Sequence, residues 1–521
     1  MEQISILDST LRDGAQGIGI SFSVEDKLRV VELLVKLGIG YIEAGNPYSN
    51  PKELQFFSRL KGRSMGGTRV AAFGSTRRKN IPVAEDDNLR SLLRADTKVC
   101  TIFGKSSKFH VERVLETDLC ENLNMIEESC SFLKSHGKEV IYDAEHFFDG
   151  YKLDPTYAVD TVSAAIRGGA DLICLCDTNG GAFPAEITEI LKRIKMLFEI
   201  PIGVHFHNDC GLAAANSLAG VMEGACHVQG TLLGFGERCG NANLVEVIGN
   251  LQLKLGRSCI EKEGLQEITQ IARGIAAVAN ISLPGNMPYV GKNAFAHKAG
   301  MHAAGVFKDS KSFEHIDPAL VGNQRRFPAS EISGKNVVLR HAREIFPDFK
   351  MTDEHARGIL SRVKVLEMDG YQFEGAEASF ELLIRKSIGS AKSFFKTLYY
   401  RIYTNYPVSE SEAGASAVVK IKVQNKVQLM AGEGNGPVNA LDQALRKALE
   451  IFYPVLSRVK LTDYKVRVLD GKKATAARVR VLITSSIDGY SYTTVGVSGD
   501  VVAASWKALE DSIEYLLINY R

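Results

Sequence analysis

The chain has 521 residues, which is too many for one ordinary hydrophobic core, so two or three domains are expected. Hydrophobic residues make up 45% and charged residues 24%, the mixture of a typical globular protein. With 63 basic and 61 acidic side chains the formal net charge is +2, which gives no support for a nucleic-acid or membrane partner. No stretch is long and apolar enough to predict a membrane span.

The cysteines and the N-terminal sequence indicate in which cellular compartment the protein is expected. The nine cysteines are scattered and odd in number, which suits reduced thiols better than a disulfide framework. The chain runs directly into Ile4–Asp8, without the basic start and apolar run of a signal peptide. We therefore expect a cytoplasmic protein, although an organellar form that has lost its transit peptide would look the same.

Short apolar runs alternate with amphipathic segments over roughly the first 235 residues. A helix is predicted over Val24–Leu37, with Ser23 as its N-cap and Gly38 at its end, and another over Ala185–Phe198. Eight alternating units indicate a (β/α)8 TIM barrel, whereas an open doubly wound sheet does not need eight. The candidate strands are Ile4–Asp8, Tyr41–Ala44, Arg69–Phe73, Lys98–Ile102, Glu139–Tyr142, Leu172–Cys176, Ile202–Phe206 and Gly230–Leu233.

The sequence changes character twice after the barrel. We expect domain boundaries that give a barrel over residues 1–260, helical linker subdomains over 261–393 and an α+β domain over 394–521. In the last domain the helices are predicted over Pro437–Tyr453 and Val501–Leu517. Its predicted strands are Ala417–Val423, Lys465–Leu469, Ala476–Thr484 and Tyr490–Val497.

Residues that bind metals or clamp carboxylates follow the first and seventh strands, where a barrel keeps its functional groups. Asp13 offers an oxygen ligand, and Arg12 suits a carboxylate or an oxyanion, although the two could also form an ordinary surface ion pair. His205 and His207 are two apart in a strand, so both imidazoles can face one point. Two imidazoles and a carboxylate are a common metal-binding set, and a pair of structural histidines is the alternative.

Three further predicted strands end in polar groups. Glu145 follows the fifth strand and could act as an acid or base, and Thr178 follows the sixth and could bind a substrate carboxylate. After the eighth strand, a glycine-rich loop carries Asn241, whose amide oxygen could join the metal ligands. Outside the barrel, either His297 or His302 could supply a general base, although a structural role is the simpler interpretation of each.

Three segments together resemble the family of 2-isopropylmalate, homocitrate and citramalate synthases: Ser9–Gly14, His205–Asp209 and Gly234–Asn241. The resemblance covers essentially the whole chain. Gly19–Lys27, Asp143–Lys152 and Phe295–Lys298 make it most similar to the long-form (R)-citramalate synthases within that family.

The resemblance implies a set of roles. A divalent metal ion (Mn, Zn, Mg or Co) would be held by Asp13, His205, His207 and Asn241. Arg12 and Thr178 would position a 2-oxo acid, with Glu145 and His302 near the reacting carbons. The helical region would complete the site of a neighbouring subunit in a homodimer, and the last domain would bind an amino-acid effector.

The implied reaction joins acetyl-CoA to a 2-oxo acid, with pyruvate as the expected acceptor and isoleucine as the matching effector. The alternatives are a larger acceptor (2-oxoisovalerate, and less well 2-oxoglutarate), a lyase that splits acyl-CoA thioesters, and a non-catalytic amino-acid sensor. The C-terminal extension argues against the lyase. The complete set of expected metal ligands argues against the sensor.

Overall fold

The computed structural model describes residues 3–328, 335–347, 351–405, 414–470 and 477–520. Its contacts divide the chain into two units, Met1–Phe295 with Ile316–Gln324, and Ala296–His315 with Arg325–Arg521. None of the helices within the described ranges is long and apolar enough to cross a membrane.

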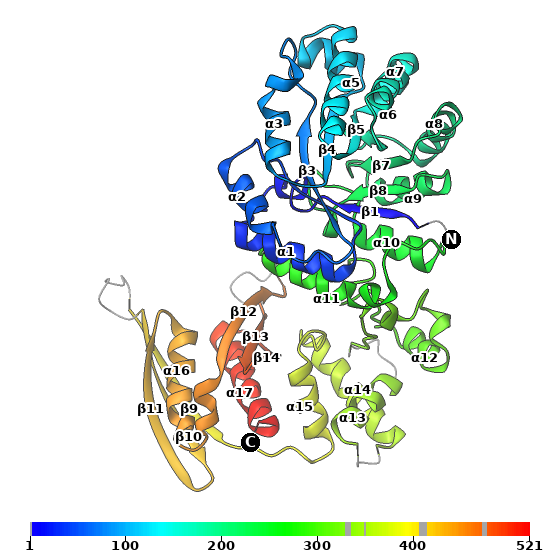
Figure 1. The fold of residues 1–521 in the computed structure, drawn as a ribbon. Helices are drawn as coiled ribbons and strands as arrows, with labels where there is room; N and C mark the ends of the chain where they lie inside the picture. Colours follow the sequence, from blue (N-terminus) through cyan, green and yellow to red (C-terminus); the bar gives the residue numbers. More distant parts are fainter. Residues whose placement is uncertain (1–2, 329–334, 348–350, 406–413, 471–476, 521) are drawn as a thin grey trace. The chain divides into compact units, whose positions relative to one another are not determined.

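The first unit is a closed barrel of eight parallel strands in sequence order (Figure 1), which confirms the predicted (β/α)8 fold and excludes the open sheet. The strands are β1 (Ser5–Asp8), β2 (Tyr41–Gly45), β3 (Arg69–Ser75), β4 (Val99–Lys105), β5 (Glu139–Glu145), β6 (Leu172–Asp177), β7 (Ile202–Phe206) and β8 (His227–Gly230). The longer helices around them are α1 (Val24–Leu37), α2 (Pro51–Leu60), α3 (Asp87–Arg94), α5 (Leu119–Ser135), α7 (Pro155–Arg167), α8 (Pro184–Leu197), α9 (Ala213–Met222), α10 (Leu244–Leu253) and α11 (Lys262–Val278).

Both faces of the barrel strands are buried, which explains their nearly continuous apolar sequences. The inner face is filled by a small cluster, Leu7, Ala71, Val99, Ile141, Cys174 and Cys176, while the outer face packs on the helices in one large core. Because all eight strands are parallel, their carboxyl ends meet at one mouth of the barrel.

Helix α1 begins and ends where its sequence predicts. The Ser23 side chain accepts a hydrogen bond from the Asp26 N–H, and the Asp26 carboxylate accepts one from the Ser23 N–H, which completes a capping box. Gly38 ends the helix at φ 82°, a left-handed conformation that glycine adopts without a steric penalty.

The predicted eighth strand, Gly230–Leu233, is wrong. The strand β8 lies earlier, and Leu232–Gly234 forms a 3-10 turn in which Leu233 has a φ of 71°. The reason is that β8 directs polar side chains into the barrel, where Gln229 is fully buried and hydrogen-bonded. The strand therefore lacks the apolar run that marks its neighbours, and the two leucines of the turn mimic one.

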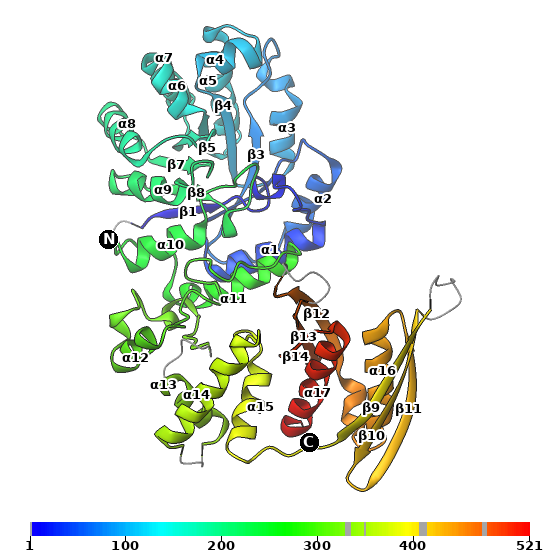
Figure 2. The ribbon, with the colours of Figure 1, turned by 180° about the vertical axis from the view of Figure 1, so that it is seen from behind.

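The second unit contains helices α12 (Gly300–Lys308), α13 (Lys335–Ile345), α14 (Asp353–Met368) and α15 (Glu377–Ser387), followed by two antiparallel sheets of three strands each. One sheet has the order β11-β10-β9 and packs on α16 (Pro437–Glu450), and the other has the order β12-β13-β14 and packs on α17 (Val501–Asn519) (Figure 2). This confirms the predicted α+β architecture. The strands are β9 (Lys396–Thr404), β10 (Ala415–Val423), β11 (Lys426–Gly434), β12 (Lys460–Val468), β13 (Val479–Ile487) and β14 (Tyr490–Ser498).

The sequence prediction omits β9 and β11, the two outer strands of the first of these sheets. Their side chains are mostly exposed, so neither strand shows a clear alternation of buried and polar positions. The glycine-rich stretch that begins at Gly432 ends β11 and leads into α16. The first residue of the predicted strand Ala476–Thr484 lies outside the described residues.

A buried ion pair joins α1 to α2 and offers a test of the packing. Lys27 Nζ lies 2.7 Å from Glu53 Oε2 and also donates to the Ala44 carbonyl oxygen, and both charged side chains are less than 10% exposed. We expect Lys27→Met to lower the free energy of unfolding by about 3–5 kcal/mol, because it leaves a buried carboxylate uncompensated. The double substitution Lys27→Met with Glu53→Met should be much less harmful. Urea unfolding of the three proteins measures this, and a single variant as stable as the wild type would contradict it.

Candidate active site

A cavity of about 210 Å³ opens at the C-terminal mouth of the barrel. Six of the residues singled out from the sequence line it, and they come from loops or strand ends far apart in the chain. The lining consists of Arg12, Asp13, Gln16, Phe73, Phe103, Asp143, Glu145, Cys176, Thr178, His205, His207, Glu237 and Arg238.

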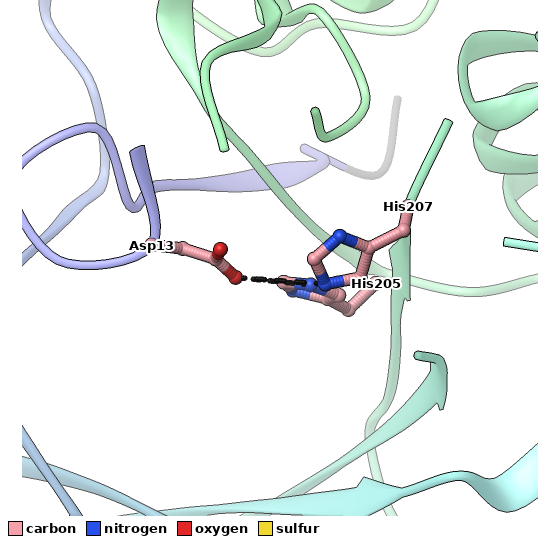
Figure 3. Close-up of side chains that lie close together, drawn as sticks. All are labelled: Asp13, His205 and His207. Carbon is pink, nitrogen blue, oxygen red and sulfur yellow. Dashed lines mark ion pairs between the residues drawn. The ribbon is translucent and has the colours of Figure 1, made fainter. Parts of the chain in front are cut away.

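Asp13, His205 and His207 converge on one point (Figure 3). Asp13 Oδ2 lies 3.5 Å from His205 Nε2 and 3.8 Å from His207 Nε2, and the three side chains are less than 10% exposed. His205 is in β7 and His207 follows it, while the intervening Phe206 packs outward against Phe148. Successive side chains of a strand point to opposite faces, so His205 and His207 both face Asp13 while Phe206 points away.

Asn241 adds an oxygen beside these three groups. The loop that carries it returns next to β7, where His207 and Asn241 form an isolated β-bridge. Its amide nitrogen donates to the Phe235 carbonyl oxygen at 3.0 Å, whereas its Oδ1 is buried and has no hydrogen-bond partner among the described residues. A buried acceptor without a partner is costly unless a cation or a donor occupies the site. Asn241 is one of the neighbours that lower the pKa of Asp13, although it is not among the residues that line the cavity.

The protonation states of these groups suit a cation. Burial alone would raise the pKa of Asp13, but Arg12 and the two imidazoles bring it down to about 2. Burial lowers the pKa of His205, and burial together with the neighbouring His205 lowers the pKa of His207 to about 4. At neutral pH the site therefore presents one carboxylate and two neutral imidazoles, the forms that bind metal.

Gln229 fixes the orientation of His205. Its amide nitrogen donates to Asp143 Oδ1 at 2.8 Å, so its amide oxygen is the atom that faces His205 Nδ1 at 2.9 Å. The imidazole must then carry its proton on Nδ1 and turn the Nε2 lone pair toward Asp13. Gln229 is missing from the sequence prediction because the position of β8 is wrong there.

Arg12 is held rigidly at the edge of the cavity. Its Nε donates to Glu43 Oε2 at 2.6 Å, its Nη1 lies 3.2 Å from Asp13 Oδ2, and its guanidinium carbon lies 3.8 Å from the centre of the Phe73 ring. Glu43 is fully buried and also accepts a hydrogen bond from Ser9 Oγ at 2.7 Å. Sequence reasoning missed Glu43, and the signal was an acidic residue inside the otherwise apolar strand β2.

Glu145 and Thr178 line the same cavity from β5 and from the loop after β6. The Glu145 carboxylate forms an ion pair with Lys105, its partner in the register of β4 and β5. Thr178 Oγ1 accepts a hydrogen bond from the His146 N–H at 2.9 Å.

The two candidate histidines outside the barrel, His297 and His302, belong to the second unit. The Nε2 atom of His297 lies 3.1 Å from Glu314 Oε1, and the ring is nine-tenths buried, which indicates a structural role. His302 is exposed on α12 and stacks on Phe313 with ring centres 4.2 Å apart. His302 is therefore the more accessible of the two, and its catalytic role stays a prediction.

Comparison with known families defines the class of protein. A model of the HMGL-like family matches residues 3–275, a model of the homocitrate synthase post-HMGL domain-like family matches 289–370, and a model of the LeuA allosteric (dimerisation) domain matches 374–517. The chain is thus an HMGL-like barrel enzyme with a domain of the LeuA allosteric (dimerisation) type.

Curated relatives narrow this class. The chain is 48% identical over 518 residues to the (R)-citramalate synthase of Aquifex aeolicus, with 99% of this chain and 98% of the relative covered. It is 47% identical over 517 residues to the enzyme of the same name from Geobacter sulfurreducens, with 99% and 98% covered. A 2-isopropylmalate synthase of Methanocaldococcus jannaschii is 29% identical, with 99% and 95% covered. The chain belongs to the (R)-citramalate synthase family.

If Asp13 and His205 bind a metal ion, as the sequence predicts, substitutions at and behind these residues should weaken metal binding to different degrees. We expect Asp13→Ala to weaken Mn²⁺ binding by more than about 100-fold, and Gln229→Leu by about 10–100-fold, because Gln229 only orients a ligand. Calorimetric titration of EDTA-treated protein measures both. His136→Ala, which removes an exposed histidine at the end of α5, is the matched control and should bind as the wild type does. Unchanged binding by Asp13→Ala would exclude this metal site.

Proposed function

We propose that this protein condenses acetyl-CoA with pyruvate and hydrolyses the thioester, giving (R)-citramalate and CoA. The observation that carries the choice of acceptor is the aromatic wall of the cavity. The rings of Phe73 and Phe103 stack with centres 5.4 Å apart and planes 17° apart, and Arg12 lies against Phe73. Because the two rings pack against each other and against Arg12, neither ring can easily move to enlarge the cavity. The small cavity therefore favours an acceptor whose side chain is a methyl group.

The residues of the cavity have separate tasks in this reaction. Arg12 directs a permanently charged donor at the keto oxygen, where negative charge develops during the addition. The Thr178 hydroxyl donates to the acceptor carboxylate. Glu145, and His302 from the helical region of the neighbouring subunit, are the candidates that take a proton from the acetyl methyl group, after which its carbon attacks the keto carbon. The alkoxide is protonated, and water cleaves the thioester to release CoA.

We further propose that Asp13, His205, His207 and Asn241 hold the divalent metal ion of this family. A bound metal supplies Lewis-acid polarisation of the keto group. Imidazole ligands suit Mn²⁺, Co²⁺ and Zn²⁺, and the oxygen ligands also suit Mg²⁺.

2-Isopropylmalate synthesis is the alternative function. Its acceptor, 2-oxoisovalerate, carries an isopropyl group in place of a methyl group, and each additional methylene changes binding by only about 1–3 kcal/mol. The relatives with that name are 28% and 29% identical to this chain, which favours pyruvate.

For the second unit we propose regulation by an amino acid and assembly as a homodimer. The support is the match of residues 374–517 to a domain described as allosteric and dimerising. In this proposal residues 1–260 catalyse, 261–393 complete the active site of the neighbouring subunit with His302, and 394–521 bind isoleucine, the amino acid expected to control citramalate formation.

Acceptor preference tests the proposed function. CoA release is measured with acetyl-CoA, Mn²⁺ and one of four acceptors: pyruvate, 2-oxobutyrate, 2-oxoisovalerate or 2-oxoglutarate. We expect kcat/KM to be highest for pyruvate and at least about 10-fold lower for 2-oxoisovalerate. Phe103→Ala should reduce that difference, because it opens the aromatic wall. A wild-type enzyme that prefers 2-oxoisovalerate would make it an isopropylmalate synthase.

Effector choice is tested on the full chain in the same assay. Isoleucine should inhibit CoA release at concentrations at which leucine does not. The inhibition should leave Mn²⁺ binding unchanged, since no metal ligand lies in residues 394–521 in this proposal. Stronger inhibition by leucine would contradict the assignment.

A further inference from the structure

His146 stands in the run Asp143–Lys152, and the reaction proposed above gives it no task. It lies between β5 and α6 (Phe147–Leu153), with a left-handed backbone at φ 58° and ψ 31°. Residues other than glycine adopt this conformation rarely and at a cost. Only 8% of the residue is exposed. A buried residue in a strained conformation directly after Glu145 requires a physical reason.

The backbone at His146 orients Thr178. Its N–H donates to Thr178 Oγ1 at 2.9 Å. Because Oγ1 accepts this bond, the hydroxyl proton of Thr178 cannot point at His146 and is free to be donated elsewhere. Thr178 lines the cavity, so the bond prepares its hydroxyl as a donor to an anionic oxygen in the cavity.

The side chain of His146 is held by stacking. Its ring lies on the ring of His110 with centres 3.6 Å apart and planes 14° apart. The Nδ1 atoms of both rings are buried and have no hydrogen-bond partner among the described residues. Burial, and then the neighbouring His110, lower the pKa of His146 to about 3, so its ring is neutral at physiological pH. Ring stacking, rather than hydrogen bonding at Nδ1, thus keeps the imidazole in place.

The partner ring is presented by an irregular segment. The short helix α4 (Lys108–His110) continues as a π-helical turn, Val111–Leu115, a conformation that is frequent at functional sites. Helix α6 packs directly on the chain before α4, since a Cβ atom on Gly150 would clash with the carbonyl oxygen of Ser106. This close approach brings the two rings together.

The contacts between β4, β5 and the turn at His146 also hold Glu145 in place. Its carboxylate pairs with Lys105, and its carbonyl oxygen accepts a hydrogen bond from the Ser106 N–H at 2.9 Å. Strand β4 therefore holds Glu145 from one side, and the turn at His146 sets the direction in which the chain leaves it.

We propose that His146 is a positioning residue: its left-handed turn, locked by the stack on His110, directs the Thr178 hydroxyl and the Glu145 carboxylate into the cavity. The inference rests on the proposed function, which assigns Thr178 to the acceptor carboxylate. Neither ring lines the cavity, so both act through other residues.

The substitution His110→Ala removes the stack and leaves the backbone of His146 unchanged in sequence. We expect kcat/KM for pyruvate to fall by about 10–100-fold, mainly through KM, because a misdirected Thr178 weakens binding of the acceptor carboxylate. His110→Phe can still stack and should remain within about 3-fold of the wild type. His136→Ala is the matched control. Metal content and melting temperature of each variant are recorded alongside.

A double-mutant cycle with Thr178→Val distinguishes positioning from general damage. If His110 acts through Thr178, then His110→Ala should change KM by less than about 2-fold once the hydroxyl is gone. Additive effects, a His110→Ala enzyme with wild-type KM, or a His110→Phe enzyme as impaired as His110→Ala would each overturn the inference. In those cases the wild type is still active with pyruvate. A wild type that is inactive with every acceptor would instead refute the proposed function, and this inference with it.

Discussion

The arrangement of the barrel mouth depends on the compensation of one buried carboxylate. Asp13 is less than 5% exposed, and an isolated charge at that depth would cost several kcal/mol. Arg12 supplies a positive charge at 3.2 Å, and that guanidinium is in turn fixed by Glu43. Asp13 and Glu43 together with Arg12 carry one net negative charge. A divalent cation held by Asp13 and the two histidines, as proposed above, would offset this charge, and Asn241 Oδ1, which has no hydrogen-bond partner among the described residues, is consistent with such a cation.

The polar contacts of the site continue into the interior of the barrel. The chain of hydrogen bonds from His205 through Gln229 to Asp143 replaces apolar packing on the inner face below the site. Burial raises the pKa of Asp143 well above its ordinary value, and the nearby Glu43 adds to the effect. This polar chain lies in the same barrel interior as the apolar cluster that contains Leu7, Val99 and Ile141.

Much of the fold and part of the site could be predicted from the sequence, for physical reasons that also explain the omissions. Alternation of apolar strands with capped helices is a local signal, and so is the spacing of His205 and His207. Glu43 and Gln229 were missed because their partners lie in other strands. The acidic residue inside the apolar strand β2 marks Glu43 as unusual, but its role depends on Arg12 and Ser9, which a local pattern does not show. The same limit explains the misplaced β8. Strands β9 and β11 were missed because a strand with mostly exposed side chains lacks the usual alternation.

In the proposed function, the two units of the chain have different tasks. The first unit contains every proposed metal ligand and the two groups proposed to orient the 2-oxo acid, Arg12 and Thr178. Proton transfer differs, because Glu145 is already paired with Lys105 and the other candidate, His302, is exposed on α12 of the second unit. In the proposed homodimer, where His302 would come from the neighbouring subunit, an effector bound to the second unit would change turnover through His302 and would leave the charges around Asp13 unchanged. Inhibition by this route would lower kcat while the metal ion and the acceptor remained bound.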